Sequence, residues 1–180
     1  MNTILQHAAP LPERPHFPPA STGPLASPDE HAAVLDALLR FAAGQDLGDA
    51  ALFRSAFTPD ATLDFTQPAA RLGVELPAFD TLDGIAGAIL PIVAKLDTTH
   101  TVSNARIHRT GHEQAQLFAL VEAMHLPKAA AGDARSSLLL KNFYWCDAVR
   151  QQEVWKLRRV HIHNVWWQGQ PDVLFGGRPD

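Results

Sequence analysis

Two charged residues stand among apolar neighbours at positions that can pair across a hairpin. A turn between residues 126 and 137 would place Glu122 opposite Lys141 in an antiparallel register. Isolated buried charges are costly, so an ion pair surrounded by apolar and aromatic side chains indicates a pocket-facing contact. A register shift of one residue reverses both faces, and the same residues would then form a solvated pair on the outer surface. The sequence leaves both alternatives open.

His161 and His163 are a second candidate pair. Alternate residues of a strand share a face, so both imidazoles project from one side of the last predicted strand. Such a pair can supply two ligands to zinc or iron, with His108 or His125 as a third. No carboxylate stands at a recognisable ligand spacing. We therefore expect no metal and no other cofactor.

Three helices are predicted in the first half of the chain. Residues 27–30, Ser-Pro-Asp-Glu, combine an N-cap, an N1 proline and the glutamate of a capping box. Apolar residues at helical spacing follow, which predicts a helix over 28–43, closed by Gly44. A short second helix is predicted over 49–56. A third is predicted over 83–96, with a mild kink at an internal proline.

The second half of the chain has the period of two that is typical of strands. A short strand is predicted earlier, at 61–66, and the stretch 67–80, punctuated by Pro and Gly, is predicted to be a loop or flap. Four long strands joined by turns then form an antiparallel meander, at 99–109, 114–126, 137–149 and 154–168. Helices followed by strands indicate the α+β class, since a parallel α/β sheet would interleave them.

The composition limits the domain organisation and the partners. The 180 residues suit one domain, 29–170, after an extended arm, 1–28, that holds seven of the fourteen prolines; a tail, 171–180, follows. The net charge of -4, without a basic run, argues against nucleic acid and anionic membranes as partners. The single cysteine, Cys146, cannot form an intrachain disulfide, and no secretory signal is recognisable, so we expect a cytoplasmic protein.

The element order and several local motifs resemble the SnoaL-like branch of the nuclear-transport-factor-2-like proteins over about residues 29–170. The resemblance implies a cone-shaped, strongly curved antiparallel sheet wrapped around the three N-terminal helices, with an internal pocket for a hydrophobic small molecule. It also implies a homodimer through the outer sheet face, where His161, His163 and Arg159 would lie. The motifs are Phe57-Thr58-Pro59-Asp60-Ala61 leading into Phe65, Thr99-His100-Thr101-Val102-Ser103-Asn104, Trp145-Cys146-Asp147 with Arg150, and Trp155-Lys156-Leu157.

In the dehydratase and dehydrochlorinase members of this family, a histidine acts as general base and an aspartate orients it. These roles map onto His100 and Asp46. A neutral imidazole, with a reference pKa of about 6.5, can accept a proton at neutral pH, and a carboxylate on its other nitrogen fixes the tautomer. Two simpler readings stand beside this one: Asp46 as the cap of the second helix, and His100 as a wall residue.

The resemblance also suggests which residues line the pocket. We expect Glu122, Lys141, Trp145, Phe65, Phe41 and Asn164 to contact the substrate, and Trp166 to point inward. Two positions depart from the active relatives. Phe41 stands where the bile-acid dehydratase type has a tyrosine, and Val160 stands near the place of an arginine that helps the leaving group. Lys141 is the candidate replacement for the missing acid.

The leading hypothesis is a cofactor-independent lyase or isomerase that acts on a small hydrophobic, oxygenated ring compound. Proton abstraction by His100 would give dehydration, elimination or isomerisation. Two alternatives use the same fold: a non-catalytic module for small-molecule binding or dimerisation, and the small structural subunit of a ring-hydroxylating dioxygenase. The substrate itself cannot be inferred from these residues.

Overall fold

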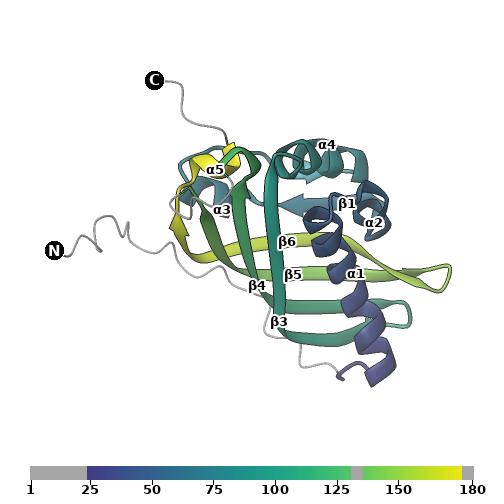
Figure 1. The fold of residues 1–180 in the computed structure, drawn as a ribbon. Coiled ribbons are helices and arrows are strands. Elements are labelled where there is room, and N and C mark those ends of the chain that lie inside the picture. Colours follow the sequence, from purple (N-terminus) through teal and green to yellow (C-terminus); the bar gives the residue numbers. More distant parts are fainter. Residues whose placement is uncertain (1–23, 131–135, 176–180) are drawn as a thin grey trace.

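A curved six-stranded sheet carries a long helix across its inner face, and shorter helices cover one end (Figure 1). The computed structural model describes residues 24–130 and 136–175; most of the predicted arm, 1–28, and half of the predicted tail, 171–180, lie outside these residues. The helices are α1 (Pro28–Asp46), α2 (Ala50–Ser55), α3 (Thr66–Arg71), α4 (Leu82–Val93) and α5 (Asp172–Phe175), with a 3-10 turn at Lys128–Ala130. None of these helices is long and apolar enough to cross a bilayer.

The strands follow the predicted order and are longer than predicted. They are β1 (Phe57–Asp64), β2 (Phe79–Asp80), β3 (Leu96–Gly111), β4 (Gln114–Pro127), β5 (Leu138–Gln151) and β6 (Val154–Gly169). The order across the sheet is β2-β1-β6-β5-β4-β3, and β3 to β6 form the predicted antiparallel meander. One pair differs from it, because β1 runs parallel to β6. The α+β class is thus confirmed, with a sheet that stays open.

Helix α1 begins as predicted and ends later. The side chain of Ser27 accepts a hydrogen bond from the backbone N–H of Glu30, which completes the capping box. Gly44 does not close the helix; it lies buried within the last turn. A Cβ there would stand 2.5 Å from the Cα of Phe53, so the glycine permits close contact between α1 and α2.

The predicted flap at 67–80 is also wrong in part, because it contains secondary structure. Most of α3 and all of β2 fall within it, and Asp64 accepts hydrogen bonds from the backbone N–H and the hydroxyl of Thr66 to start α3. These short elements rest on tertiary contacts: the side chain of Gln67 accepts a bond from the backbone N–H of Asn164 on β6. Local periodicity over so few residues gives no signal for them.

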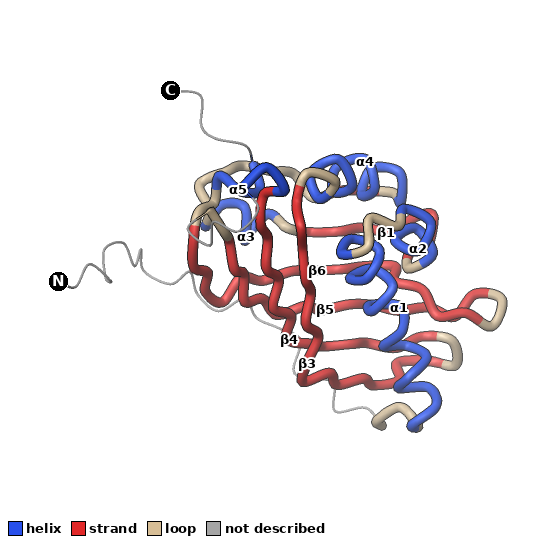
Figure 2. Tube along the Cα trace, in the orientation of Figure 1, coloured by secondary structure: helices blue, strands red, loops and turns tan. Residues whose placement is uncertain are grey.

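Bulges shape the sheet and change which residues face inward. Figure 2 shows β3 and β4 bending sharply, and β3 has an irregular register between Ser103 and Arg106, where Asn104 has a φ of 52°. A second bulge lies in β6, since Lys141 pairs with Trp166 whereas Asn142 pairs with Asn164. The extra residue turns Trp166 to the outer face, so the predicted inward orientation of this side chain is wrong.

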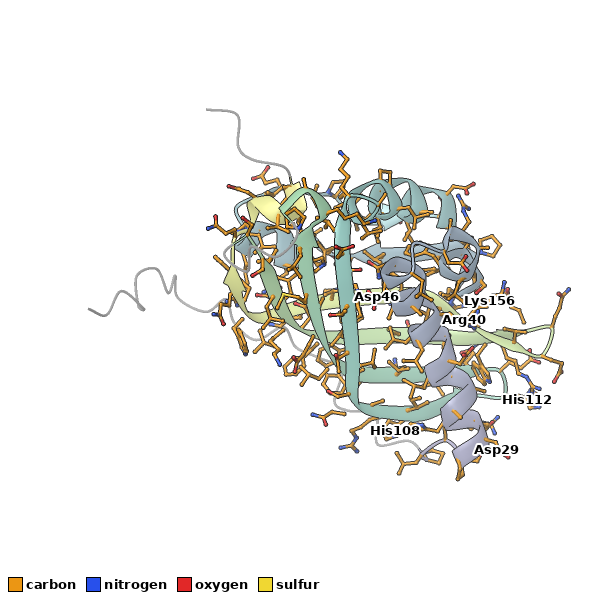
Figure 3. All side chains as sticks on the ribbon, in the orientation of Figure 1. Asp29, Arg40, Asp46, His108, His112 and Lys156 are labelled. Atoms are coloured by element: carbon orange, nitrogen blue, oxygen red, sulfur yellow. The ribbon has the colours of Figure 1, made fainter. Side chains whose placement is uncertain are left out.

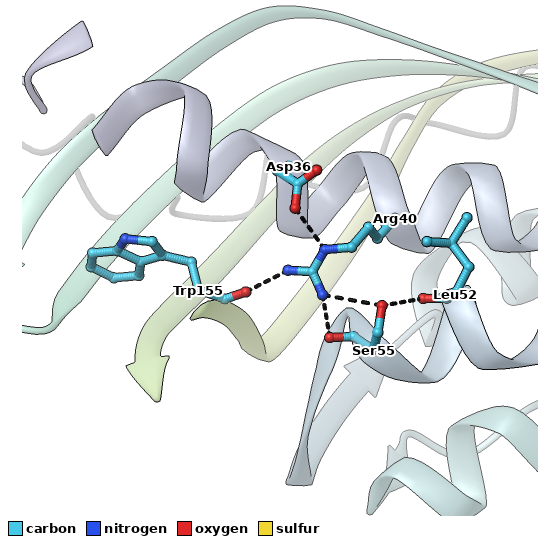
Figure 4. Close-up of polar contacts among 5 residues, drawn as sticks. All are labelled: Asp36, Arg40, Leu52, Ser55 and Trp155. Atoms are coloured by element: carbon cyan, nitrogen blue, oxygen red, sulfur yellow. Dashed lines mark hydrogen bonds and ion pairs between the residues drawn. The ribbon is translucent and has the colours of Figure 1, made fainter. Parts of the chain in front are cut away.

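Arg40 joins α1 to the end of α2 and to the start of β6 (Figure 4). Its guanidinium donates to the backbone carbonyl of Ser55 and, at 2.6 Å, to that of Trp155. Its Nε also donates to Asp36, one turn earlier on α1, at 2.7 Å. The backbone acceptors at the end of α2 would otherwise lack partners, so this arginine fixes the position of α1 over the sheet.

Candidate active site

Asp46 lies at the C-terminal end of α1 beside β3 (Figure 3). Its Oδ1 accepts hydrogen bonds from the hydroxyl of Thr98 at 2.8 Å and from Nδ1 of His100 at 2.6 Å. Its Oδ2 accepts the backbone N–H of His100 at 2.8 Å. The helix cap that Asp46 offered as an alternative is made by Asp49, whose side chain accepts from two backbone N–H groups of α2.

The geometry fixes the tautomer of His100. An ionised carboxylate can only accept, so Nδ1 carries a proton, and in the neutral imidazole Nε2 then has the lone pair. The side chain of His100 is only 4% exposed. Burial alone would raise the pKa of the Asp46 carboxyl, but hydrogen bonds and charge from His100, with the hydroxyl of Thr98, outweigh it and lower that pKa. Asp46 is therefore ionised at neutral pH.

His125 lies beside His100 and was not predicted as part of this site. The two ring centroids are 5.8 Å apart in an edge-to-face arrangement. Nδ1 of His125 donates to the carbonyl of Leu138 at 3.2 Å, so its Nε2 also keeps a lone pair. Burial and the neighbouring His100 lower the pKa of His125 to about 4. The strand register is the sequence signal that could have found it. Thr98 pairs with His125 and His100 pairs with Ala123, so the two histidines share one face of the sheet.

Three polar side chains lie farther along the same inner face. Nδ2 of Asn164 donates to Oδ1 of Asn142 at 2.9 Å, and Asn142 also hydrogen-bonds the hydroxyl of Tyr144. All three are almost fully buried. Oδ1 of Asn164 is a buried acceptor without a hydrogen-bond partner within the described residues. Asn164 thus lies on the predicted inner face; its contact with a substrate stays a prediction.

A partly open cavity of about 100 Å³ lies between α1, α4, α5 and the inner sheet face; we call it the inner cavity. Phe41 and Phe65, both predicted pocket residues, line it. The lining is apolar except for the amide of Gln45 and the hydroxyl of Tyr144. Neither Asp46 nor His100 is among the residues that line this cavity. Asp46 follows Gln45 directly, and its charge adds to burial in raising the pKa of Tyr144.

Glu122, Lys141 and Trp145 do not face the inner cavity. Glu122 pairs with Lys141 across the hairpin as predicted, and the two form an ion pair. The buried positions of these strands are the alternate ones, including Val121 and Asn142. Of the two orientations left open, the outer-face one is therefore present, and the expected contact of this pair with a substrate in the pocket is wrong. The ring of Trp145 lies 4.6 Å from that of Phe118, within an outer-face aromatic cluster that also includes Phe143. Lys141 therefore cannot supply an acid to the inner site.

The two histidines of β6 also belong to the outer side. Nδ1 of His161 lies 3.2 Å from Oδ2 of Asp64, which forms a second His–Asp pair. His163 is partly buried two residues later. Within residues 24–130 and 136–175, no three His, Cys, Asp or Glu side chains converge closely enough to hold a metal. The homodimer through this face stays a prediction.

Comparison with known proteins gives two results at the sequence level. The chain matches the model of the SnoaL-like domain over residues 27–161. The terrestric acid biosynthesis cluster protein E of Penicillium crustosum is 28% identical over 158 residues, which make up 86% of this chain and 94% of that protein.

Two solved structures have similar folds. A candidate scytalone dehydratase from Novosphingobium aromaticivorans has a TM-score of 0.66 at 16% identity, over 84% of this chain and 96% of that one. A type 2 hexachlorocyclohexane dehydrochlorinase has a TM-score of 0.63 at 15% identity, over 78% and 88%. At these identities the likeness shows the fold alone.

Proposed function

Because this chain belongs to the SnoaL-like family, we propose that it is a cofactor-independent lyase or isomerase acting on a small hydrophobic, oxygenated ring compound. The observation that carries the proposal is the 2.6 Å contact between Nδ1 of His100, an almost fully buried side chain, and the Asp46 carboxylate. The similar folds of a candidate scytalone dehydratase and a dehydrochlorinase support the same reaction class.

The general base is the Nε2 lone pair of His100. It takes a proton from a carbon next to a carbonyl or a leaving group, and the C–H electron pair forms the enolate or the new double bond. The imidazolium that results is stabilised by the Asp46 carboxylate, which three hydrogen bonds already hold in place. The same imidazolium then returns the proton, either to another carbon or to the leaving group.

His125 has a different part in this proposal. Its low pKa keeps it neutral at physiological pH, so it does not act as an acid there. Its Nε2 instead accepts a hydrogen bond from a substrate hydroxyl beside the base. Because His125 is neutral, no positive charge from its ring lies beside His100 when His100 takes up the proton.

The inner cavity also favours a second candidate function, a module that binds a small apolar ligand without transforming it. A largely apolar cavity with two polar groups is what a binding site needs, whether or not chemistry follows. The two candidates differ in one measurable quantity, the exchange of carbon-bound protons with solvent.

A test that needs no identified product is deuterium incorporation at carbon. Cyclic ketones are incubated with the protein in D₂O, and loss of the α-proton signal is followed by NMR. We expect exchange to be faster with the unaltered chain than without protein. The variant His100→Gln should lower this rate by about 10²- to 10⁴-fold, the usual contribution of a general base.

The chain provides a matched control for this experiment. His161 also pairs with an aspartate, but it lies on the outer face, so His161→Gln should leave the exchange rate unchanged. Equal exchange rates for His100→Gln and the unaltered chain would end the catalytic proposal. Ketone binding without exchange would support the binding module instead.

A further inference from the structure

The inner cavity has two polar residues in an otherwise apolar lining. The polar groups are the amide of Gln45, on α1, and the hydroxyl of Tyr144, on β5. Beyond them the lining consists of aliphatic and aromatic side chains from α4, α5 and the neighbouring strands, such as Ala88, Ile89 and Phe175. A ligand that fills this space therefore meets apolar side chains over most of its surface.

The amide of Gln45 has capacity left for a ligand. Gln45 is 8% exposed, and its Nε2 donates to the carbonyl of Phe41 at 3.3 Å. Within the described residues, its Oε1 and second amide hydrogen have no other hydrogen bond, although a buried amide normally uses both. Phe41, whose carbonyl accepts from Gln45, packs with its ring centroid 6.5 Å from that of Tyr144. Asn142 hydrogen-bonds the Tyr144 hydroxyl. One oxygen function of a ligand would satisfy this pair.

We propose that the inner cavity binds a linear alkyl substituent of the substrate, while Gln45 and Tyr144 hydrogen-bond a single carbonyl or hydroxyl oxygen where that substituent joins the ring. This inference rests on the proposed function and names the substrate class: a ring ketone or alcohol with an alkyl chain. Gln45 directly precedes Asp46, whose carboxylate holds His100, so the inference directs the bound oxygen and its neighbouring C–H bond toward the proposed base.

The volume sets the length of the chain. An apolar cavity of about 150 Å³ in another protein holds the six carbons of benzene. The inner cavity, at about 100 Å³, is two-thirds of that size and should hold about four carbons. A longer chain would extend beyond this volume and gain no further affinity.

The test is a homologous series of 2-alkylcyclohexanones, from the unsubstituted ring to the hexyl compound, titrated against the unaltered protein by calorimetry. We expect the dissociation constant to fall about fourfold for each methylene, the usual effect of burying one CH₂, up to about four carbons and then to level or rise. A dissociation constant that does not change with chain length, or no binding by any member of the series, would overturn the inference.

Substitutions in and outside the inner cavity test where the alkyl chain binds. Ala88→Leu places three carbons in the cavity and should shorten the best alkyl chain by about three methylenes, whereas Ala33→Leu, the same change on the exposed side of α1, should not. Gln45→Met keeps the bulk without the amide, and should weaken every ketone by about two- to tenfold at unchanged chain preference. An unchanged preference in Ala88→Leu would refute the assignment. His100→Gln should keep the chain preference, so a failure of the catalytic proposal remains distinguishable.

Discussion

Replacing His125 by asparagine should flatten the dependence of stability on pH between 6.5 and about 4. In the unfolded chain a histidine takes up its proton near pH 6.5, whereas folded His125 does so only at about 4, because burial and the nearby His100 disfavour the charge. Between these values the unfolded chain holds one more proton than the folded chain. The free energy of unfolding therefore falls as the pH is lowered.

The magnitude follows from proton linkage. One proton of difference changes the free energy of unfolding by about 1.4 kcal/mol per pH unit. Across the interval from 6.5 to about 4 this amounts to about 3 kcal/mol, a large share of the stability of an ordinary domain. The stabilisation is fully present above pH 6.5 and is lost below about 4.

Urea unfolding of both proteins across this pH interval measures the effect. Asparagine can still donate to the carbonyl of Leu138 but cannot titrate, so the difference between the two pH slopes isolates His125. Contributions shared by both proteins, such as that of His163, whose pKa burial also lowers, cancel in this difference. Equal slopes for the two proteins would refute the reasoning, whatever their absolute stabilities.

Three further substitutions test the framework around the site. Gly44→Ala should lower the free energy of unfolding, measured in urea, by about 1–3 kcal/mol because the new Cβ meets α2. Gly87→Ala, in open space on α4, should instead raise it by up to about 1 kcal/mol. A change of the same sign in both variants would contradict this reasoning. Arg40→Met should cost about 1–3 kcal/mol by the same assay, since it leaves backbone carbonyls without donors, against under about 1 kcal/mol for Arg54→Met at a surface ion pair. Asp46→Asn should slow ketone exchange at least about tenfold, because both carboxylate oxygens accept N–H groups of the histidine and an amide has only one acceptor oxygen. Unchanged exchange would show that the aspartate does not orient the base.

Strand register explains why some predicted site residues lie on the inner face of the sheet and others on the outer face. The hairpin between β4 and β5 was located well enough to pair Glu122 with Lys141, yet their face was left open. Strand alternation has a period of two, so one bulge or slip exchanges inside and outside. The bulge in β6 did so for Trp166.

The predictions for the helix end at Gly44 and for the short helix α3 were wrong for a different reason. Gly44 carries the signature of a helix end, but its reason for being glycine is Phe53, nine residues later and on another helix. Likewise α3 is held by contacts to β6 rather than by its own propensity. Such contacts leave no local pattern to detect.

The sequence by itself determined the α+β class, the succession of long strands and the capping box of α1, because periodicity and capping act over a few neighbouring residues. It also supplied the acidic and imidazole groups of the site. Only the tertiary structure decided that Asp46 meets Thr98 and His100 rather than capping α2, and that His125 joins them while Lys141 stays outside. Curvature and register bring these groups together across more than fifty residues of chain, and neither is encoded in any single segment.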